Sequence, residues 1–260
     1  MSEFIEFLKE LAEESGSIIR KYFRSKINIE YKSDTTPVTA ADREAEIKLR
    51  EMIMEKFPDH GILGEEFENI NPDAVYQWIL DPIDGTKNFV TGTCLFGSLI
   101  ALLESGKPIL GMINNPILNH VLIGDRETTR LNGIPVRVRA CKKLENATLL
   151  TTSHWSVGRT QDGEAFESLS RKVKMYRTWG DCYGYYLLAT GYADIMIDPL
   201  MHIWDVAPLV PIIEGAGGVI TDYYGGDPIK GVGVIASSGK IHDEIIRYLN
   251  PKRYEQADEK

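Results

Sequence analysis

Two aspartates, a glycine and a threonine follow directly after the apolar residues 78–80. Residues 81–86 read Asp-Pro-Ile-Asp-Gly-Thr. Carboxylate oxygens are the ligands that hard cations such as Mg²⁺ select. Backbone N–H groups at a chain reversal that opens a helix can approach a phosphate. The segment therefore fits a metal-held phosphate, although a surface turn explains these residues equally well when they are taken alone.

Further carboxylates stand before and far beyond this segment. Glu65 and Glu66 precede it, and by themselves they are typical of a solvated acidic turn. Asp205 lies more than a hundred residues later, at the expected start of an apolar helix. A single aspartate there most often serves as a favourable charge near the helix N-terminus. These segments become informative through their order in the chain.

In this order the motifs resemble the Mg²⁺-dependent inositol monophosphatase superfamily, from about residue 4 to about residue 249. The resemblance is carried by Gly-Glu-Glu at 64–66, the motif at 81–86, Trp-Asp-Val-Ala at 204–207 and Gly-Ala-Gly-Gly at 215–218. Residues 177–185, Arg-Thr-Trp-Gly-Asp-Cys-Tyr-Gly-Tyr, are most similar to the histidinol-phosphate phosphatase branch. Inositol monophosphatases usually carry small residues after the corresponding glycine.

The resemblance implies that oxygen ligands hold two or three Mg²⁺ ions around one substrate phosphate. Every acidic position of the family's pattern is filled in this chain. The implied metal ligands are Glu65, Asp81, the backbone carbonyl of Ile83, Asp84 and Asp205.

The same resemblance assigns catalytic roles to Asp42, Thr86 and Glu65, with Asp42 and Thr86 orienting and deprotonating the attacking water. Residues 39–42 resemble the family's Thr-x-x-Asp segment. Thr39 and Asp42 also have the spacing of a capping box that opens a helix. The two interpretations are compatible, because an acid that is fixed at a helix start is well positioned.

Metal ions must supply the positive charge that a phosphomonoester dianion needs before water can attack it. Lys87 is the only basic residue beside the Asp-Gly-Thr segment, and the chain has a formal net charge of −9. A cation makes its water more acidic, so a Thr86–Asp42 pair can relay the proton near neutral pH. No phosphoenzyme is expected, because no serine or cysteine stands beside a plausible base in these motifs.

Asp181 and Asp198 bear on the choice of substrate. Histidinol phosphate carries an amine and an imidazole, and carboxylates beside such a leaving group favour it over a polyol. Asp198 stands where inositol-binding members also place an acid, so Asp181 is the discriminating residue. A helix N-cap is the alternative role for Asp181. The substrate-binding residues expected are Asp84, Gly85, Thr86, Asp181, Asp198 and Asp205.

Three functions are compatible with these residues. The first is a Mg²⁺-dependent histidinol-phosphate phosphatase that serves histidine synthesis. The second is an inositol or sugar-alcohol monophosphatase of the same superfamily. The third is a catalytically inactive protein that binds metal or phosphate. The joint presence of all the implied catalytic and metal-binding residues disfavours this third function.

The composition indicates a soluble enzyme with a sizeable core. Of the 260 residues, 43% are hydrophobic and 26% are charged. No stretch approaches the roughly 20 apolar residues of a membrane span, and the amphipathic N-terminus is neither a signal nor a transit peptide. We therefore expect cytoplasmic residence. Cys94, Cys141 and Cys182 are widely spaced and odd in number, which predicts reduced thiols.

The expected partner is a small phosphomonoester. The acidic balance disfavours nucleic acid, whose phosphates attract a basic face. Basic pairs such as residues 142–143 are too short and scattered to be more than solvated surface. No membrane partner is expected, and the resemblance implies a homodimer.

Hydrophobic periodicity predicts an α+β half followed by an α/β half. In the first half, helices are expected at 4–23 and 40–57, and antiparallel strands at 78–80, 97–103, 109–114 and 120–123. In the second half, strands are expected at 148–152, 174–178, 193–197, 219–221 and 232–236, and helices at 182–190, 205–214 and 242–249. Residues 153–170 are expected to form a polar loop.

These halves predict an N-terminal α+β subdomain at 1–145 that carries most metal ligands. A C-terminal α/β subdomain at 146–250 carries Asp205 and the substrate-side residues, and 251–260 form a polar tail. The periodicity permits the layered αβαβα sandwich of the inositol monophosphatase and fructose-1,6-bisphosphatase type, which the resemblance implies. Ligands from both halves place the site in the cleft between them.

Overall fold

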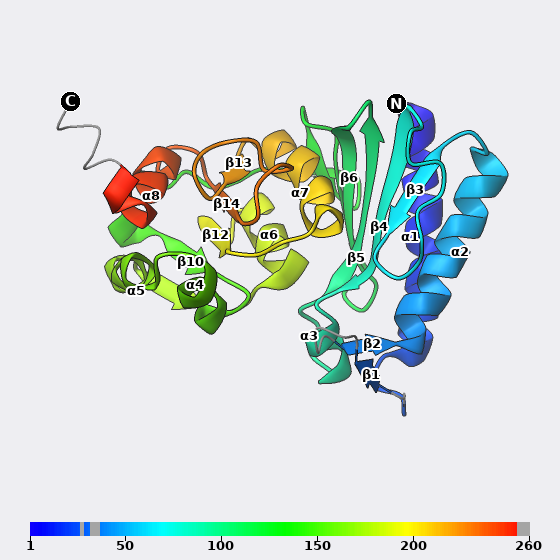
Figure 1. Cartoon of the computed structure of the whole chain (residues 1–260), viewed down its shortest axis with the longest axis horizontal. Coiled ribbons are helices and arrows are strands. Elements are labelled where there is room, and N and C mark those ends of the chain that lie inside the picture. The colour runs from blue at the N-terminus through cyan, green and yellow to red at the C-terminus, as the bar shows by residue number, and fades with distance from the viewer. Residues whose placement is uncertain (27–28, 32–36, 254–260) are drawn as a thin grey trace.

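Helices and sheets alternate in layers in the computed structural model, which describes residues 1–26, 29–31 and 37–253 (Figure 1). Two long helices cover one face of a seven-stranded sheet. Two further helices lie between this sheet and a five-stranded sheet, whose far face is covered by the helices at 154–160, 163–172 and 242–249. The expected αβαβα sandwich is therefore confirmed.

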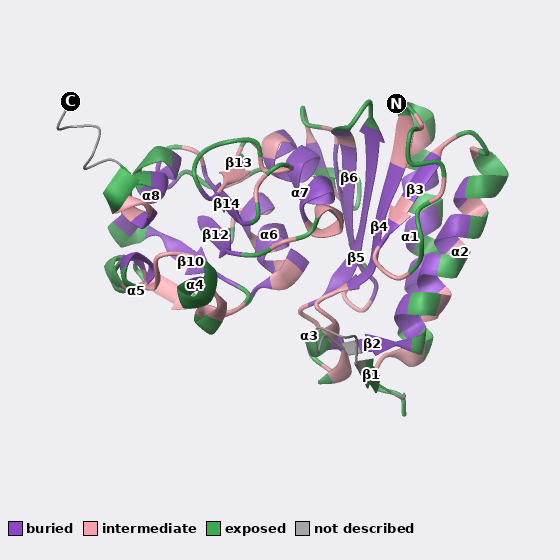
Figure 2. Cartoon of the chain, in the orientation of Figure 1, coloured by how far each residue is buried: buried purple, intermediate pink, exposed green. Residues whose placement is uncertain are grey.

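The outer helices α1 (Ser2–Tyr22) and α2 (Ala40–Lys56) agree closely with the expected helices at 4–23 and 40–57. Each buries one apolar stripe against the sheet, with Leu8 on α1 and Ile53 on α2 fully buried. Figure 2 shows the neighbouring strands as buried along most of their length. This packing holds the first sheet from outside, so its other face is available to the middle layer.

The seven strands of the first sheet follow one another in chain order, and all neighbours are antiparallel except β3 and β4. The strand expected at 78–80 is longer than predicted and includes both aspartates of the 81–86 motif. The strands are β3 (Gly61–Gly64), β4 (Tyr76–Asp84), β5 (Gly97–Glu104), β6 (Lys107–Asn115), β7 (His120–Gly124), β8 (Thr129–Leu131) and β9 (Ile134–Val136).

The second sheet has the order β11-β10-β12-β14-β13, so its strands are not in chain order. β10 pairs in parallel with β11 and β12, whereas β14 is antiparallel to both of its neighbours. All five strands were expected from the sequence. They are β10 (Thr148–Leu150), β11 (Met175–Arg177), β12 (Ile195–Asp198), β13 (Val219–Asp222) and β14 (Val234–Ser237).

The middle layer consists of α6 (Asp181–Ala189) and α7 (Ile203–Gly215), which match the helices expected at 182–190 and 205–214. The outer face of the second sheet carries α4 (His154–Thr160), α5 (Gly163–Lys172) and α8 (His242–Leu249). The expectation of a loop at 153–170 is wrong. Asp162 caps α5 by accepting a hydrogen bond from the backbone N–H of Ala165, and Phe166 and Leu169 are buried at helical spacing.

Several short elements were not expected. They are β1 (Ile29–Tyr31), β2 (Pro37–Thr39), α3 (Thr86–Val90), the 3₁₀ turn η1 (Leu144–Asn146) and the strands β3, β8 and β9 of the first sheet. Of the expected tail at 251–260, residues 254–260 lie outside the described residues. Within the described part of the chain, no helix is long and apolar enough to cross a membrane, and Cys94, Cys141 and Cys182 are free thiols.

Both sheets share one apolar core around the middle layer. Leu99 and Leu122 of the first sheet and Met196 of the second pack into one cluster with Leu209 and Ile212 of α7. The division into subdomains at 145/146 falls between the two sheets and stays a prediction, because this core joins the two halves.

Helix α7 lies very close to the first sheet because glycines face it. A Cβ on Gly111 of β6 would stand 1.9 Å from the carbonyl oxygen of Pro208, and one on Gly124 of β7 would stand 2.5 Å from the Cα of Ile212. These two close contacts set how near α7 lies to the first sheet, and with it the position of Asp205 at the helix start.

We predict that Gly111→Ala destabilises the protein by about 3 kcal/mol or more, since α7 must move away from the sheet to admit the methyl group. Chemical denaturation measures the change in the free energy of unfolding. Gly158→Ala is the matched control, because its Cβ would meet nothing nearer than 3.8 Å. Equal stability of the two variants would contradict the close packing of α7.

Candidate active site

A bulge at the end of β4 turns Asp81 and Asp84 to the same side of the sheet. Residues three apart on a regular strand point to opposite faces. Here three steps on β4, from Asp81 to Asp84, match two on β5, from Leu99 to Gly97. The extra residue restores a common side for the two carboxylates. Ser98 Oγ donates to the Pro82 carbonyl (2.7 Å) across this bulge.

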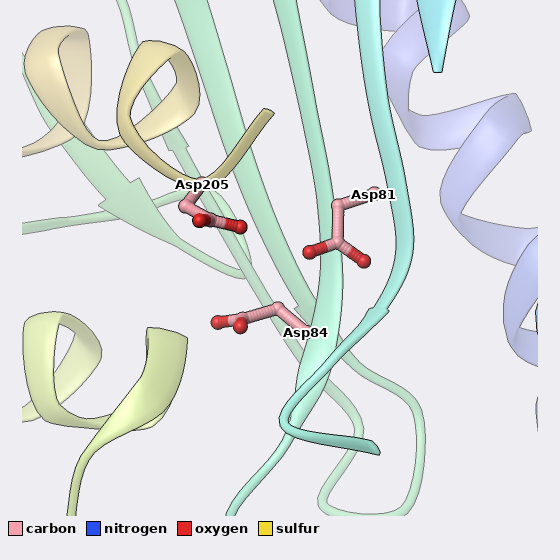
Figure 3. A group of neighbouring side chains, drawn as sticks. All are labelled: Asp81, Asp84 and Asp205. Atoms are coloured by element: carbon pink, nitrogen blue, oxygen red, sulfur yellow. The ribbon is translucent and has the colours of Figure 1, made fainter. Parts of the chain in front are cut away.

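Asp205 reaches the same space from the first turn of α7. Its Oδ2 accepts a hydrogen bond from the backbone N–H of His202 (2.7 Å), which fixes the side chain at the helix start. Asp81, Asp84 and Asp205 each offer an oxygen, and these oxygens lie within 4.8 Å of one another. Figure 3 shows the three carboxylates directed into one space between β4 and α7.

Asp81 is buried and Asp84 and Asp205 are half-buried beside it, and this strongly affects the protonation of all three. Burial and then the charges of Glu65, Asp84 and Asp205 raise the pKa of Asp81 well above its usual value. Burial and the charge of Asp181 do the same for Asp84. Burial also raises the pKa of Asp205 to about 6. When ionised, the three carboxylates concentrate negative charge in one place, which is the electrostatic condition for binding a hard cation.

The possible metal ligands at this site are all oxygen atoms, which is the ligand type that Mg²⁺ prefers. Asp81, Asp84 and Asp205 supply carboxylates, and the Ile83 carbonyl lines the same cavity. Glu65 also lines this cavity, although its carboxylate is outside the group of three. Its backbone N–H donates to the Leu80 carbonyl (3.1 Å), which places Glu65 beside the end of β4.

The Asp-Gly-Thr turn continues from the bulge into α3. Gly85 has a φ of 87°, a left-handed conformation that favours glycine. Thr86 begins the helix, and its Oγ1 donates to the Ile83 carbonyl (3.0 Å). The Thr86 hydroxyl is thus bonded to the Ile83 carbonyl, and no hydrogen bond joins it to the Asp42 side chain, both being described residues; the proton relay by this pair stays a prediction.

Asp42 occupies the capping box that the sequence predicted. The Thr39 backbone N–H and Oγ1 donate to Asp42 Oδ2, at 2.8 and 2.6 Å. Burial raises the pKa of Asp42 to about 7, and the charges of Glu66 and Glu65 add to this shift. The charge of Asp42 acts in turn on Asp81, so Asp42 stands at the edge of the carboxylate cluster.

Two cavities meet at the cluster. One, of about 650 Å³, is lined by residues 83–88 together with Glu65, Asp81, Asp181 and Asp205. The other, of about 270 Å³, lies on the side of α4 and is lined by Asp198, Asp181, Asp84 and Asp205. All the expected site residues except Asp42 line one or both of these cavities.

Asp181 is not the helix N-cap that was considered as its alternative role. Gly180 is the N-cap of α6, and Asp181 is the first helical residue, with a φ of 49°. Its Oδ2 accepts a hydrogen bond from Asn88 Nδ2 (2.7 Å). Burial raises the pKa of Asp181 to about 6.

Asp198 faces the smaller cavity from the end of β12. It accepts hydrogen bonds from the Thr152 backbone N–H (3.0 Å) and from the Tyr185 hydroxyl (3.2 Å). Burial raises its pKa to about 7. Asp181 and Asp198 thus give this cavity an acidic wall.

Sequence reasoning missed some residues that shape the site. Asn88 stands four positions after Asp84, so its closeness to the motif could have drawn attention to it. Thr152 gave no signal, because its bonds to Asp181 and Asp198 are contacts between distant parts of the chain. The backbone N–H of Cys182 donates to Asp84 Oδ2, a contact that no side-chain pattern reveals.

Comparison with known proteins places the chain in a family. A model of the inositol monophosphatase family matches residues 1–254. A histidinol-phosphatase of Chlorobaculum parvum is 37% identical over 95% of this chain and 96% of its own length. A chloroplastic bifunctional phosphatase of Arabidopsis thaliana is 47% identical over 83% of this chain, which spans 63% of that relative.

A solved inositol monophosphatase from Zymomonas mobilis has the same fold. It aligns with a TM-score of 0.86 at 36% identity and covers 96% of this chain and 98% of its own.

We predict that the metal-free protein becomes less stable as the pH rises from about 4 to 7. The folded-state pKa values of Asp42, Asp181, Asp198 and Asp205 are about 6 to 7, above the roughly 3.9 of an unfolded aspartate. The folded chain therefore binds more protons in this window, and its free energy of unfolding falls as they are lost. Denaturant titrations in EDTA measure this dependence.

Mg²⁺ should reverse the trend, because it binds the deprotonated carboxylates. We expect it to raise the melting temperature more at pH 8 than at pH 5. Asp84→Asn should reduce both the pH dependence and the gain from Mg²⁺. A free energy of unfolding of the wild-type protein that does not change between pH 4 and 7 would contradict the proposed burial of these carboxyl groups.

Proposed function

Because this chain belongs to the inositol monophosphatase family and is a phosphoric monoester hydrolase, we propose that its reaction is the Mg²⁺-dependent hydrolysis of histidinol phosphate. The products are histidinol and phosphate, and the reaction belongs to histidine synthesis. The observation that carries the proposal is the meeting of Asp81, Asp84 and Asp205 beside an acid-lined cavity.

The family depends on Mg²⁺ in general, and we propose two or three ions at this site. The proposed ligands are Glu65, Asp81, the Ile83 carbonyl, Asp84 and Asp205. Bound Mg²⁺ would supply the positive charge that offsets both these carboxylates and the phosphate dianion. The raised pKa values of Asp81 and Asp84 support this assignment, since they reflect withdrawal from water and the charges of neighbouring carboxylates.

The remaining residues of the turn bind the phosphate and orient the water. Gly85 and Thr86 present backbone N–H groups at the start of α3. Thr86 Oγ1 donates to Ile83, which leaves its lone pairs free to accept a hydrogen bond from the attacking water. Asp42, with a pKa of about 7, and Glu65 take up the proton near neutral pH.

The leaving group extends toward the smaller cavity. Asp181 and Asp198 line it, and each carries a negative charge in its deprotonated form. An ammonium or imidazolium group gains a favourable interaction there, whereas the neutral hydroxyls of a polyol gain less. This difference supports histidinol phosphate, and so does the 37% identity to the histidinol-phosphatase of Chlorobaculum parvum.

An inositol or sugar-alcohol monophosphatase is the second candidate. It is favoured by the likeness to the inositol monophosphatase of Zymomonas mobilis. It also agrees with Asp198, which stands where inositol-binding members place an acid. The inactive binding protein considered from the sequence is set aside, because the relatives are phosphatases.

We also propose that the protein works as a homodimer in the cytoplasm. Both proposals rest on the family resemblance and on the composition of the chain. The expected partner stays a small phosphomonoester.

We predict that the enzyme, with Mg²⁺, releases phosphate from histidinol phosphate with a kcat/KM at least about tenfold above that for inositol 1-phosphate. The acidic wall of the smaller cavity is the reason. Colorimetric phosphate release at matched substrate concentrations measures the ratio. Equal rates would remove the role given to Asp181 in substrate choice.

Asp84→Asn should lower phosphate release by about a hundredfold or more, because it removes one charge from the proposed metal site while keeping its shape. Asp222→Asn, on β13 and outside both cavities, is the control for the loss of an aspartate. Circular dichroism should show that the fold is kept. Unchanged phosphate release by the Asp84 variant would rule out the proposed metal site.

A further inference from the structure

Resting on the proposed function, we propose that Asn88 determines substrate choice by orienting the Asp181 carboxylate toward the leaving-group cavity. The site then selects phosphomonoesters whose leaving group carries an ammonium. Asn88 is a positioning residue in this proposal, because it acts through Asp181.

The amide of Asn88 can adopt only one orientation. Its Nδ2 donates to Asp181 Oδ2 (2.7 Å) and to the Leu95 carbonyl (3.0 Å). Its Oδ1 accepts a hydrogen bond from Thr93 Oγ1 (3.1 Å). A flipped amide would set its oxygen against a carboxylate and a carbonyl, and would lose these donors. The hydrogen bonds with Leu95 and Thr93 therefore fix the Asn88 amide with its NH₂ group toward Asp181.

Asp181 needs this support because of its backbone. With a φ of 49°, it lies in a conformation that residues other than glycine rarely adopt. Its backbone N–H donates to Thr152 Oγ1 (2.7 Å), which fixes the main chain. Asn88 fixes the side chain at the other end. Such strain persists only where neighbouring groups hold it, and it is concentrated at functional sites.

The orientation matters because Asp181 borders both cavities. Its Oδ2 stands 3.0 Å from the position that a Cβ on Gly85 would take, so the carboxylate lies directly against the phosphate-binding turn. Asp198 lies on the wall of the smaller cavity, held by Thr152 and Tyr185. A leaving-group ammonium beside the turn can thus reach Asp181 with the phosphate in place.

Asn88 also links the phosphate-binding turn to the Asp181 carboxylate, which binds the amine in this proposal. It belongs to α3, the helix that begins at Thr86, and its bond crosses to the first residue of α6. The phosphate-binding turn and the carboxylate for the amine are therefore held at a constant separation. A phosphomonoester with its amine at the matching distance fits this pair, and a neutral polyol gains less from it.

The test compares Asn88→Ala with wild type on histidinol phosphate and inositol 1-phosphate. We expect the ratio of the two kcat/KM values to fall about tenfold, through a higher KM for the amine substrate. A charge-assisted hydrogen bond that orients a binding group has an effect of this size. An equal loss on both substrates would show a merely structural role and overturn the proposal.

Asn115→Ala is the matched control. Asn115 Nδ2 donates to the carbonyls of Cys94 and Phe96, so it holds the same loop without touching Asp181. We expect this variant to keep the wild-type ratio even if it is less stable. A fall in the ratio equal to that of Asn88→Ala would assign the effect to the loop and overturn the proposal.

A double-mutant cycle separates action through Asp181 from other effects. Asp181→Asn removes the charge, and asparagine tolerates the positive φ. In that background, Asn88→Ala should change the KM for histidinol phosphate less than twofold. A further tenfold change would mean that Asn88 acts independently of Asp181.

Binding of histidinol itself, measured by calorimetry, tests the inference without turnover. Wild type should bind it about tenfold more tightly than Asn88→Ala, with Asn115→Ala like wild type. Such binding without phosphate release would refute the proposed reaction and keep the amine subsite. Release of phosphate with equal histidinol binding by all three proteins would refute the role of Asn88 and keep the reaction.

Discussion

The repulsion between closely spaced carboxylates is the constraint on which the rest of the structure depends. Asp81, Asp84 and Asp205 hold oxygens within 4.8 Å of one another, and burial raises the pKa of each. Such an arrangement costs stability until a cation or protons neutralise it. The fold must therefore hold these side chains against their own charge, and backbone features do much of this.

Three of these features act together. The bulge in β4 turns two aspartates to one side, Gly85 turns the chain into α3, and Gly111 lets α7 approach the sheet closely enough to bring Asp205. None of them contributes a side chain to the chemistry. Their common effect is to fix positions before any ligand binds, which is how a site avoids reorganisation when the reaction takes place.

On the leaving-group side, hydrogen bonds from side chains and backbone fix the carboxylates before a ligand binds. Asn88 and Thr152 hold Asp181, and Thr152 with Tyr185 holds Asp198. Each carboxylate is thus held from two separate parts of the chain, so α3, α6 and the end of β10 meet at one cavity. The phosphate end and the amine end of a substrate are recognised by a single connected network.

The sequence by itself determined the types and order of the groups that line the site, since the motifs at 81–86 and 204–207 and the capping box at Thr39 are local patterns. It also gave most helices and strands through their periodicity. It missed α4 and α5, whose buried stripe is short, and short elements such as β3, β8 and β9. Only the tertiary structure decided that Asp81 and Asp84 share a side, that the Thr86 hydroxyl lies on Ile83, and that Asn88 meets Asp181. The physical reason is that a bulge and long-range hydrogen bonds depend on partner strands and helices that no local pattern specifies.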